Sequence, residues 1–269
     1  MFEPLTIALI DAAIGAGRII LDIYGGDFAV ETKKDASPVT AADEAAESHI
    51  LACLKEAAPE IPVIAEEEVA AGRVPGLEHR FILVDPLDGT KEFISRNGEF
   101  TVNIALIEGG RPIAGVVLAP VTGVIYVGEV GKGAWSGKVN GSGEIDWQPA
   151  RVRNPAPAAL TVVASRSHLT DDTKAFIERF DVGEMVSTGS SLKFCRLAVG
   201  DADLYPRLGR TMEWDTAAGD AVLRAAGGEV LTMDGQPLAY GKRDQADDSD
   251  FANPWFVACG AVNPFTASA

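Results

Sequence analysis

The sequence predicts a mixed α/β (α+β) protein, and three stretches of the chain carry that prediction. Residues 4–24 place apolar side chains at helical spacing and stop at Gly25-Gly26, a signal for the end of a helix. Residues 101–129 hold three strand-like runs with little helix between them, which is typical of an antiparallel meander. From about residue 150 strands and helices alternate, as in an α/β fold.

In the first half, a strand is expected at 28–32 and a polar loop at 33–39. Thr40 opens the next helix with Asp43 three residues later, the spacing of a capping box, and this helix continues to about Ala57. Further strands are expected at 61–65, 81–84, 101–108, 112–119 and 124–129.

In the second half, the alternation predicts strands at 160–164, 184–188, 203–206 and 255–259, and helices at 171–180, 190–199 and 214–226. The segment 137–158 is rich in Gly, Pro and Asn, so it is the expected boundary between two halves, 1–148 and 149–269. Residues 241–250 are polar and acidic and are expected to form a mobile surface loop.

Composition excludes several classes of protein. An apolar content of 47% excludes a disordered chain, and a net charge of −16 argues against a nucleic-acid polymer or an anionic membrane as the main partner. The three cysteines are scattered and odd in number, so they predict neither a disulfide framework nor a CxxC metal site. The three histidines, His49, His79 and His168, are too dispersed for a histidine metal site or a Ser-His-Asp triad.

The N-terminal segment has no basic region, and Glu3 and Asp11 interrupt its apolar run. No stretch reaches the ~20 uninterrupted apolar residues of a membrane span. We therefore expect no integral membrane segment and a cytoplasmic location, with peripheral association with the inner membrane left open.

The most informative stretch is FILVDPLDGTKE at 81–92, a buried strand that ends in Asp85, Asp88, Gly89 and Thr90. Ligand sites in α/β proteins form at the ends of such strands. Two carboxylates three positions apart repel each other unless a cation neutralises them, and oxygen ligands suit Mg²⁺ or Mn²⁺ better than zinc. The alternative is an Asp-rich turn that only caps the next helix.

Other carboxylates occur in comparable places. Glu66-Glu67-Glu68 follows the strand at 61–65, and Asp43 and Asp215 each lie in the first turn of an expected helix. Taken singly, these acidic residues are explained by the helix dipole or by a solvated surface. Their combination with the turn at Asp85 and Asp88 favours one shared site.

The strings DPLDGT (85–90) and WDTAAG (214–219) resemble those of the lithium-sensitive, metal-dependent phosphomonoesterase superfamily of inositol monophosphatase and fructose 1,6-bisphosphatase. Three longer strings are similar to the 3′(2′),5′-bisphosphate nucleotidases of the CysQ type: SPVTAAD (37–43), LVDPLDGTKEFISRNGEFTVNIAL (83–106) and GSSLKFC (189–195). The resemblance covers almost the whole chain.

This resemblance implies a layered α/β/α/β/α sandwich with the site between the two halves. It implies a Mg²⁺-dependent phosphatase that removes the 3′-phosphate of adenosine 3′,5′-bisphosphate (PAP) to give AMP, a step linked to sulfate assimilation. The expected partner is a small phosphorylated nucleotide, and the chain is expected to be a monomer or a homodimer. The alternatives are an inositol- or sugar-phosphate phosphatase and an inactive relative that binds metal or nucleotide.

The resemblance also implies roles for individual residues. Two or three Mg²⁺ ions, or Mn²⁺, would be held by the carboxylates of Glu66, Asp85, Asp88 and Asp215 and the backbone carbonyl of Leu87. Asp43 and Thr90, acting with Glu66, would orient and deprotonate the attacking water. Glu67 is left open as a substitute for Glu66, and no role is assigned to Glu213. Ala65 is a mild departure from the family pattern.

For the substrate, the resemblance implies contacts from Asp88, Gly89, Thr90, Lys91 and Asp215 around the reacting phosphate. Ser190, Ser191 and Lys193 would contact the nucleotide, and Arg207 would bind the 5′-phosphate. Read alone, the segment 189–193 is better explained as an ordinary serine N-cap followed by an exposed lysine.

Overall fold

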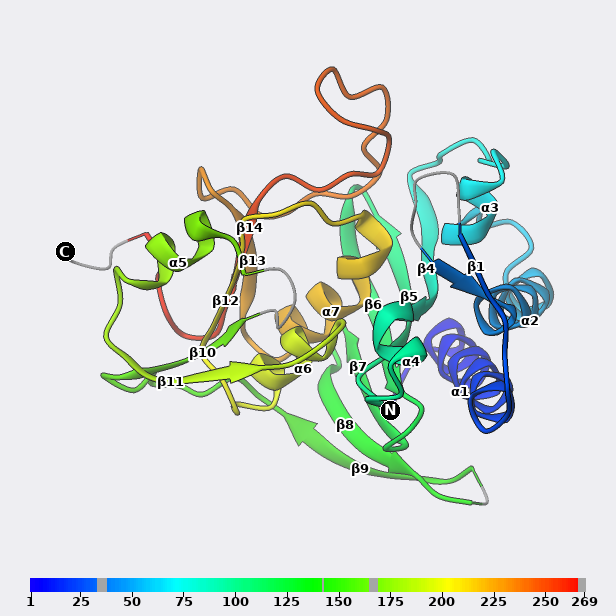
Figure 1. Cartoon of the computed structure of the whole chain (residues 1–269), viewed down its shortest axis with the longest axis horizontal. Coiled ribbons are helices and arrows are strands. Elements are labelled where there is room, and N and C mark those ends of the chain that lie inside the picture. The colour runs from blue at the N-terminus through cyan, green and yellow to red at the C-terminus, as the bar shows by residue number, and fades with distance from the viewer. Residues whose placement is uncertain (33–37, 142, 165–168, 266–269) are drawn as a thin grey trace.

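The computed structural model describes residues 1–32, 38–141, 143–164 and 169–265. The polar loop expected at 33–39 lies mostly outside the described residues, and His168 lies outside them entirely. Helices and strands alternate in layers across the molecule (Figure 1).

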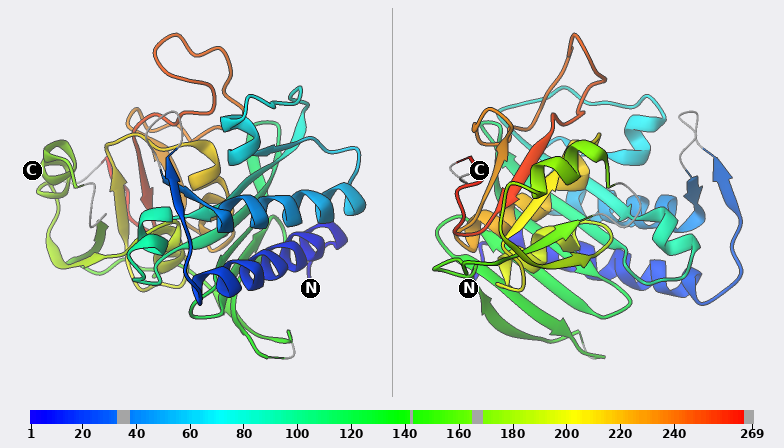
Figure 2. Two further views of the ribbon diagram at one scale, coloured as in Figure 1. Left: turned by 45° about the vertical axis from the view of Figure 1, so that its right-hand side comes forward. Right: turned by 60° about the vertical axis from the view of Figure 1, so that its left-hand side comes forward.

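The fold has five layers, and three hydrophobic clusters fill the spaces between them. Helices α1 (Pro4–Tyr24) and α2 (Ala41–Ala57) pack on one face of a seven-stranded sheet. Helices α6 (Leu192–Ala198) and α7 (Glu213–Ala225) lie between that sheet and a five-stranded sheet. Helix α5 (Asp171–Ile177) covers the outer face of the second sheet. The α/β/α/β/α sandwich is therefore confirmed (Figures 1 and 2).

The seven-stranded sheet follows chain order. Its strands are β3 (Val63–Ala65), β4 (Arg80–Asp88), β5 (Thr101–Glu108), β6 (Arg111–Ala119), β7 (Val124–Glu129), β8 (Gly133–Val139) and β9 (Ile145–Ala150). The pair β3–β4 is parallel and every later pair is antiparallel, so the meander is confirmed.

Strands β8 and β9 were not predicted, and they occupy much of the segment expected to be a boundary. Gly133, Gly137 and Pro149 hid the strand pattern, and these strands at the end of the sheet are little buried, with Ala134 and Ala150 as their buried residues. The chain leaves the first sheet after Ala150 and enters the second at Leu160.

The five-stranded sheet has the order β11 (Val182–Ser187), β10 (Leu160–Ala164), β12 (Leu204–Arg207), β14 (Phe256–Cys259) and β13 (Glu229–Thr232). Strand β10 is parallel to β11 and β12, while β14 is antiparallel to both of its neighbours. The four residues of β13 were not predicted, since a run this short carries little periodicity.

Alternate side chains of β4 point to opposite faces of the sheet, and both faces are covered. Ile82 and Val84 pack into the cluster beneath α1 and α2, while Phe81 and Leu83 pack into the central cluster. A strand covered on both faces reads as a continuous apolar run, which is the pattern seen in the sequence.

Helix α7 lies unusually close to the first sheet, because two strands present glycine to it. A Cβ on Gly115 would come within 2.6 Å of Ala218 O, and a Cβ on Gly128 within 2.5 Å of Val222 Cα. This close packing fixes the helix that carries Asp215.

The loop at 241–250 is exposed, as expected, and projects from the body of the molecule (Figure 2, orange). Its base is fastened by Glu213, which is fully buried and accepts hydrogen bonds from the backbone N–H groups of Gly241 (2.6 Å) and Lys242 (2.8 Å). Glu213 also pairs with the Lys242 ammonium at 2.7 Å. Glu213, for which no role was predicted, thus anchors this loop.

Among the described residues, α1 is the one helix long and apolar enough to cross a membrane by length and composition. One face of it, including Leu9, Ile10 and Ile20, is buried against α2 and the seven-stranded sheet. That packing is typical of a core helix.

Candidate active site

The turn after β4 begins within the strand itself. Pairing with β5 is regular to Asp85, breaks, and resumes at Asp88 opposite Thr101. Pro86 has no N–H for the ladder, so the backbone bulges there. The Asp85 carboxylate accepts a hydrogen bond from Leu87 N at 3.0 Å and holds the bulge in place. The predicted strand therefore extends four residues further, to Asp88.

The backbone conformation at position 89 favours glycine. It adopts the left-handed conformation, with φ of 97° and ψ of 45°, directly before α4 (Thr90–Ile94). A side chain at this φ is strained, and a Cβ would meet Glu99 O at 3.3 Å.

Asp43 and Thr90 come together from α2 and α4. Thr90 Oγ1 donates to Asp43 Oδ1 at 3.2 Å, and the same hydroxyl lies 3.4 Å from Leu87 O. The other carboxylate oxygen, Asp43 Oδ2, accepts from Thr40 N (2.8 Å) and Thr40 Oγ1 (2.7 Å), which confirms the predicted capping box. Asp43 is 2% exposed, so its orientation is fixed.

Asp88 is held by the segment before α6. Its Oδ2 accepts hydrogen bonds from Ser190 Oγ and Ser191 N, both at 2.7 Å, and from Asn103 Nδ2 at 3.3 Å. Ser190 has a φ of 55°, which is uncommon for a residue other than glycine. The two halves of the chain thus meet at one carboxylate.

Asp215 lies in the first turn of α7, where its Oδ2 accepts from Met212 N at 2.8 Å. Ser191 Oγ donates to the Asp215 carbonyl at 2.6 Å. Burial, followed by the negative charges of Asp88 and Glu66, raises the pKa of Asp215 to about 8. A nearby cation would remove this penalty on the ionised form.

Glu66 is the first residue of α3 (Glu66–Ala70), and it follows a strand that is parallel to β4. Ala65 pairs with Val84, so Glu66 and Asp85 leave adjacent strands at the same edge of the sheet. The backbone N–H groups of Glu67 and Glu68 donate to the Glu47 carboxylate.

All the side chains predicted to hold metal provide oxygen atoms, the donors that Mg²⁺ prefers. Across the described residues, no three His, Cys, Asp or Glu side chains lie close enough together to enclose an ion. The chemistry of the donors and the repulsion that Asp88 and Glu66 exert on Asp215 nevertheless fit a divalent cation.

The predicted substrate contacts differ in their surroundings. Lys193 is 7% exposed, and its ammonium donates to Ser190 O at 2.6 Å and lies 3.4 Å from Thr188 O. Burial lowers its pKa to about 8, although the Asp88 charge acts in the opposite direction. Lys91 is exposed on α4, and the half-buried Arg207 donates to Arg210 O at 3.1 Å. Lys193 therefore secures the turn at Ser190, rather than lying exposed.

Two residues of the hydrogen-bond network around Asp88, namely Thr101 and Asn103, were not predicted. Asn103 donates to Asp88 and to Ser191 Oγ (3.0 Å), and its Oδ1 lies 2.9 Å from the Thr101 hydroxyl, which also contacts the Ser190 hydroxyl. Both are buried on β5. The available signal was the presence of two polar residues, in TVNIAL, within an otherwise apolar strand.

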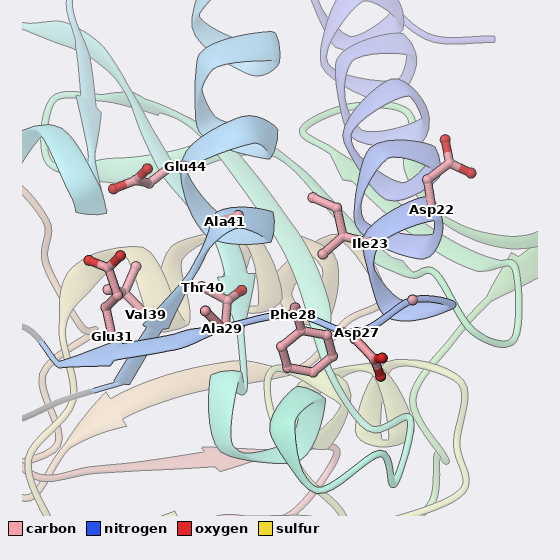
Figure 3. A pocket seen from close by; sticks show the side chains of 11 residues that line it. Asp22, Ile23, Asp27, Phe28, Ala29, Glu31, Val39, Thr40, Ala41 and Glu44 are labelled. Atoms are coloured by element: carbon pink, nitrogen blue, oxygen red, sulfur yellow. The ribbon is translucent and has the colours of Figure 1, made fainter.

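A cavity of about 410 Å³ lies beside Thr40, between the end of α1 and the start of α2 (Figure 3). Its lining carries the carboxylates of Asp22, Asp27, Glu31 and Glu44 and no basic side chain among the described residues. None of the residues predicted to hold metal or substrate lines this cavity, so we do not assign it to the substrate.

The layered α/β/α/β/α fold, with an Asp–Thr pair and a seryl turn gathered around the carboxylates at the end of β4, is the architecture of a class of phosphomonoesterases. The chain belongs to the inositol monophosphatase family, which it matches over residues 1–255.

Three relatives illustrate the similarity. The chain is 47% identical to the 3′(2′),5′-bisphosphate nucleotidase CysQ of Salmonella typhimurium over 91% of this chain and 95% of that one. The same identity and coverage hold for CysQ of Escherichia coli K12. A crystal structure of CysQ from Bacteroides thetaiotaomicron matches with a TM-score of 0.79 and 38% identity over 97% of this chain and 99% of that one.

Proposed function

We propose that this protein is a Mg²⁺-dependent 3′(2′),5′-bisphosphate nucleotidase that hydrolyses the 3′-phosphate of PAP to give AMP and phosphate. The observation that carries the proposal is the 47% identity to CysQ nucleotidases over nearly the full length of both chains. Ions would be held by the carboxylates of Glu66, Asp85, Asp88 and Asp215 and by the Leu87 carbonyl. We propose two or three Mg²⁺ ions, with Mn²⁺ as a substitute.

Bound Mg²⁺ would supply charge neutralisation of the phosphoryl oxygens and of the leaving oxygen. The protein's own residues prepare the water. Thr90 Oγ1 donates its hydrogen to Asp43, which leaves the threonine oxygen lone pairs to accept a hydrogen bond from water. As the water attacks phosphorus, its proton passes to Thr90 Oγ1 while the threonine proton passes to Asp43 Oδ1.

The Thr40 hydrogen bonds support this role of Asp43. They occupy Oδ2 and leave Oδ1 directed at Thr90. Glu66, from the neighbouring strand end, would complete the catalytic group as a ligand of a bound ion.

A nucleoside bisphosphate needs two anion-binding regions. The backbone of Gly89 and Thr90 and the Lys91 ammonium would face the reacting phosphate, together with Asp88 and Asp215 through the ions. Ser190, Ser191 and Lys193 would shape the nucleotide side of the site, and Arg207 would pair with the second phosphate. The positive charge of Arg207 opposes the rise in the pKa of Asp215, which supports this assignment.

The protein would act in the cytoplasm on a by-product of sulfate activation, as a monomer or a homodimer. Light scattering after gel filtration distinguishes the two states. We expect phosphate release to require Mg²⁺ and to fall as Li⁺ is added.

A substrate panel tests the proposed specificity. With saturating Mg²⁺, kcat/KM is measured for PAP, inositol 1-phosphate and fructose 1,6-bisphosphate. We expect PAP to give the highest value by at least tenfold. A preference for inositol phosphate would instead support the alternative phosphatase of the same family.

A further inference from the structure

Glu47 is a buried carboxylate with an unusual pair of partners. It lies on α2 and is 3% exposed. Its Oε2 accepts a hydrogen bond from Glu67 N at 2.8 Å, and its Oε1 accepts one from Glu68 N at 2.9 Å. Both donors belong to the first turn of α3, so a side chain from a distant helix takes the place of a local cap.

The short helix α3 needs such a cap. Its N-cap residue is Ala65, which has no side chain that can accept a hydrogen bond. The first N–H groups of a helix have no partner within the helix. Glu47 supplies two acceptors for them, and it thereby fixes the backbone at the start of the helix, where Glu66 lies.

Glu47 also shares a helix face with Asp43. Residues four apart on a helix lie one above the other, so these two carboxylates emerge from neighbouring turns of α2. Asp43 binds Thr90 at the start of α4, and Glu47 binds the start of α3. One rigid helix therefore sets the position of Thr90 and of Glu66 together.

We propose that Glu47 is a positioning residue that holds Glu66 in register with the Asp43–Thr90 pair for metal binding. This inference rests on the metal role proposed above for Glu66. Glutamine at position 47 would keep the shape but retain only one acceptor, and its amide group would face an N–H donor.

The test compares Glu47→Gln with wild type by titrating Mg²⁺ alone in a calorimeter. Loss of a residue that orients a ligand weakens metal affinity by about 10–100-fold, so the Kd for Mg²⁺ should rise at least tenfold. Amide exchange measured by NMR should accelerate at Glu67 and Glu68. Glu56→Gln, an exposed change on the same helix, should match wild type in both measurements.

Two results would contradict the proposal for Glu47, and a parallel variant separates its failure from a failure of the metal role of Glu66. An unchanged Kd for Mg²⁺ in Glu47→Gln contradicts the proposal, including when the variant is merely less stable to urea. Unchanged exchange at Glu67 and Glu68 also contradicts it. Glu66→Gln is measured in parallel: if it too leaves the Kd unchanged, the metal role of Glu66 is wrong, whereas a weakened Glu66→Gln beside a normal Glu47→Gln refutes the role of Glu47 alone.

A second variant keeps the test decisive if Glu47→Gln does not fold. Glu47→Asp retains the carboxylate one methylene further from the two N–H groups. It should weaken Mg²⁺ binding to a smaller degree, and wild-type affinity in this variant would contradict the proposal.

Discussion

Thr90 donates its hydroxyl hydrogen to Oδ1 of Asp43 across 3.2 Å, while Oδ2 of the same carboxylate closes the capping box of α2 with Thr40. One aspartate therefore serves the helix through one oxygen and the candidate catalytic threonine through the other. The capping and the catalytic interpretations of Asp43 are compatible.

Replacing Thr90 by valine should remove the proton path and keep the side-chain shape. We expect kcat for PAP to fall about 10²–10⁴-fold, the usual contribution of a positioned acid–base group, with KM changed only a few-fold. Steady-state kinetics measure both values. Thr122→Val is the control and should keep the wild-type kcat, because the Thr122 hydroxyl bonds Ala119 O and Val124 N in the turn after β6. Wild-type kcat in Thr90→Val would refute the proposed role.

Asn103 should contribute to both stability and activity. Asn103→Ala removes the donors to Asp88 and Ser191 and leaves buried polar groups without this partner. Such losses cost about 1–3 kcal/mol, so the free energy of unfolding in urea should fall by that amount. The Mg²⁺ concentration for half-maximal activity should also rise, because Asp88 loses a restraint. A variant as stable and active as wild type would contradict the network.

Asp220 should make stability depend on pH. It is fully buried, Tyr240 donates a hydrogen bond to it at 3.0 Å, and Arg224 lies 3.9 Å away. Burial raises its pKa to about 7, although Arg224 acts in the opposite direction. A raised carboxyl pKa stabilises the fold below the unfolded value, and that contribution is lost as the pH rises through about 7.

The Asp220→Asn variant isolates this effect. The stability of wild type relative to the variant should decline between pH 4 and pH 8. The change is at most about 4 kcal/mol, which is the free energy equivalent of the pKa difference. Urea unfolding of both proteins at several pH values measures it. A difference that is constant with pH would contradict the prediction.

Gly128 should not tolerate a side chain. A Cβ there would lie 2.5 Å from Val222 Cα and 2.6 Å from Ala221 O, both in the backbone of α7. Overpacking of this kind costs about 1–3 kcal/mol, so Gly128→Ala should unfold at lower urea concentration. Gly76→Ala, where nothing lies within 4 Å, is the matched control. Equal stability of the two variants would show that α7 can move away from the sheet.

Much of the fold could be predicted because its signals are local. The helix at 4–24, the capping box at Thr40 and the strands of the meander follow from periodicity and from the chemistry of side chains near each other in sequence. Strands β8 and β9 were missed because turn-forming residues obscured the pattern of a sheet edge with little burial.

The site could be predicted in part. Carboxylates at strand ends and in first helical turns were visible, but no local signal shows that Ser190 and Ser191 reach Asp88, about a hundred residues earlier. Glu47 reads as an ordinary helical glutamate, and only the tertiary structure brings it to the N-terminus of α3. Lys193 was expected to contact nucleotide, and its burial against Ser190 O depends on packing that the sequence does not specify.

The most direct test is phosphate release from PAP by wild type and by Asp88→Asn, each with and without Mg²⁺. Asparagine can still accept hydrogen bonds from Ser190 and Ser191, so the variant should fold normally by circular dichroism. We predict that wild type releases phosphate only with Mg²⁺, that Li⁺ suppresses the release, and that Asp88→Asn is inactive. No release by wild type in saturating Mg²⁺, or full activity in Asp88→Asn, would contradict the account.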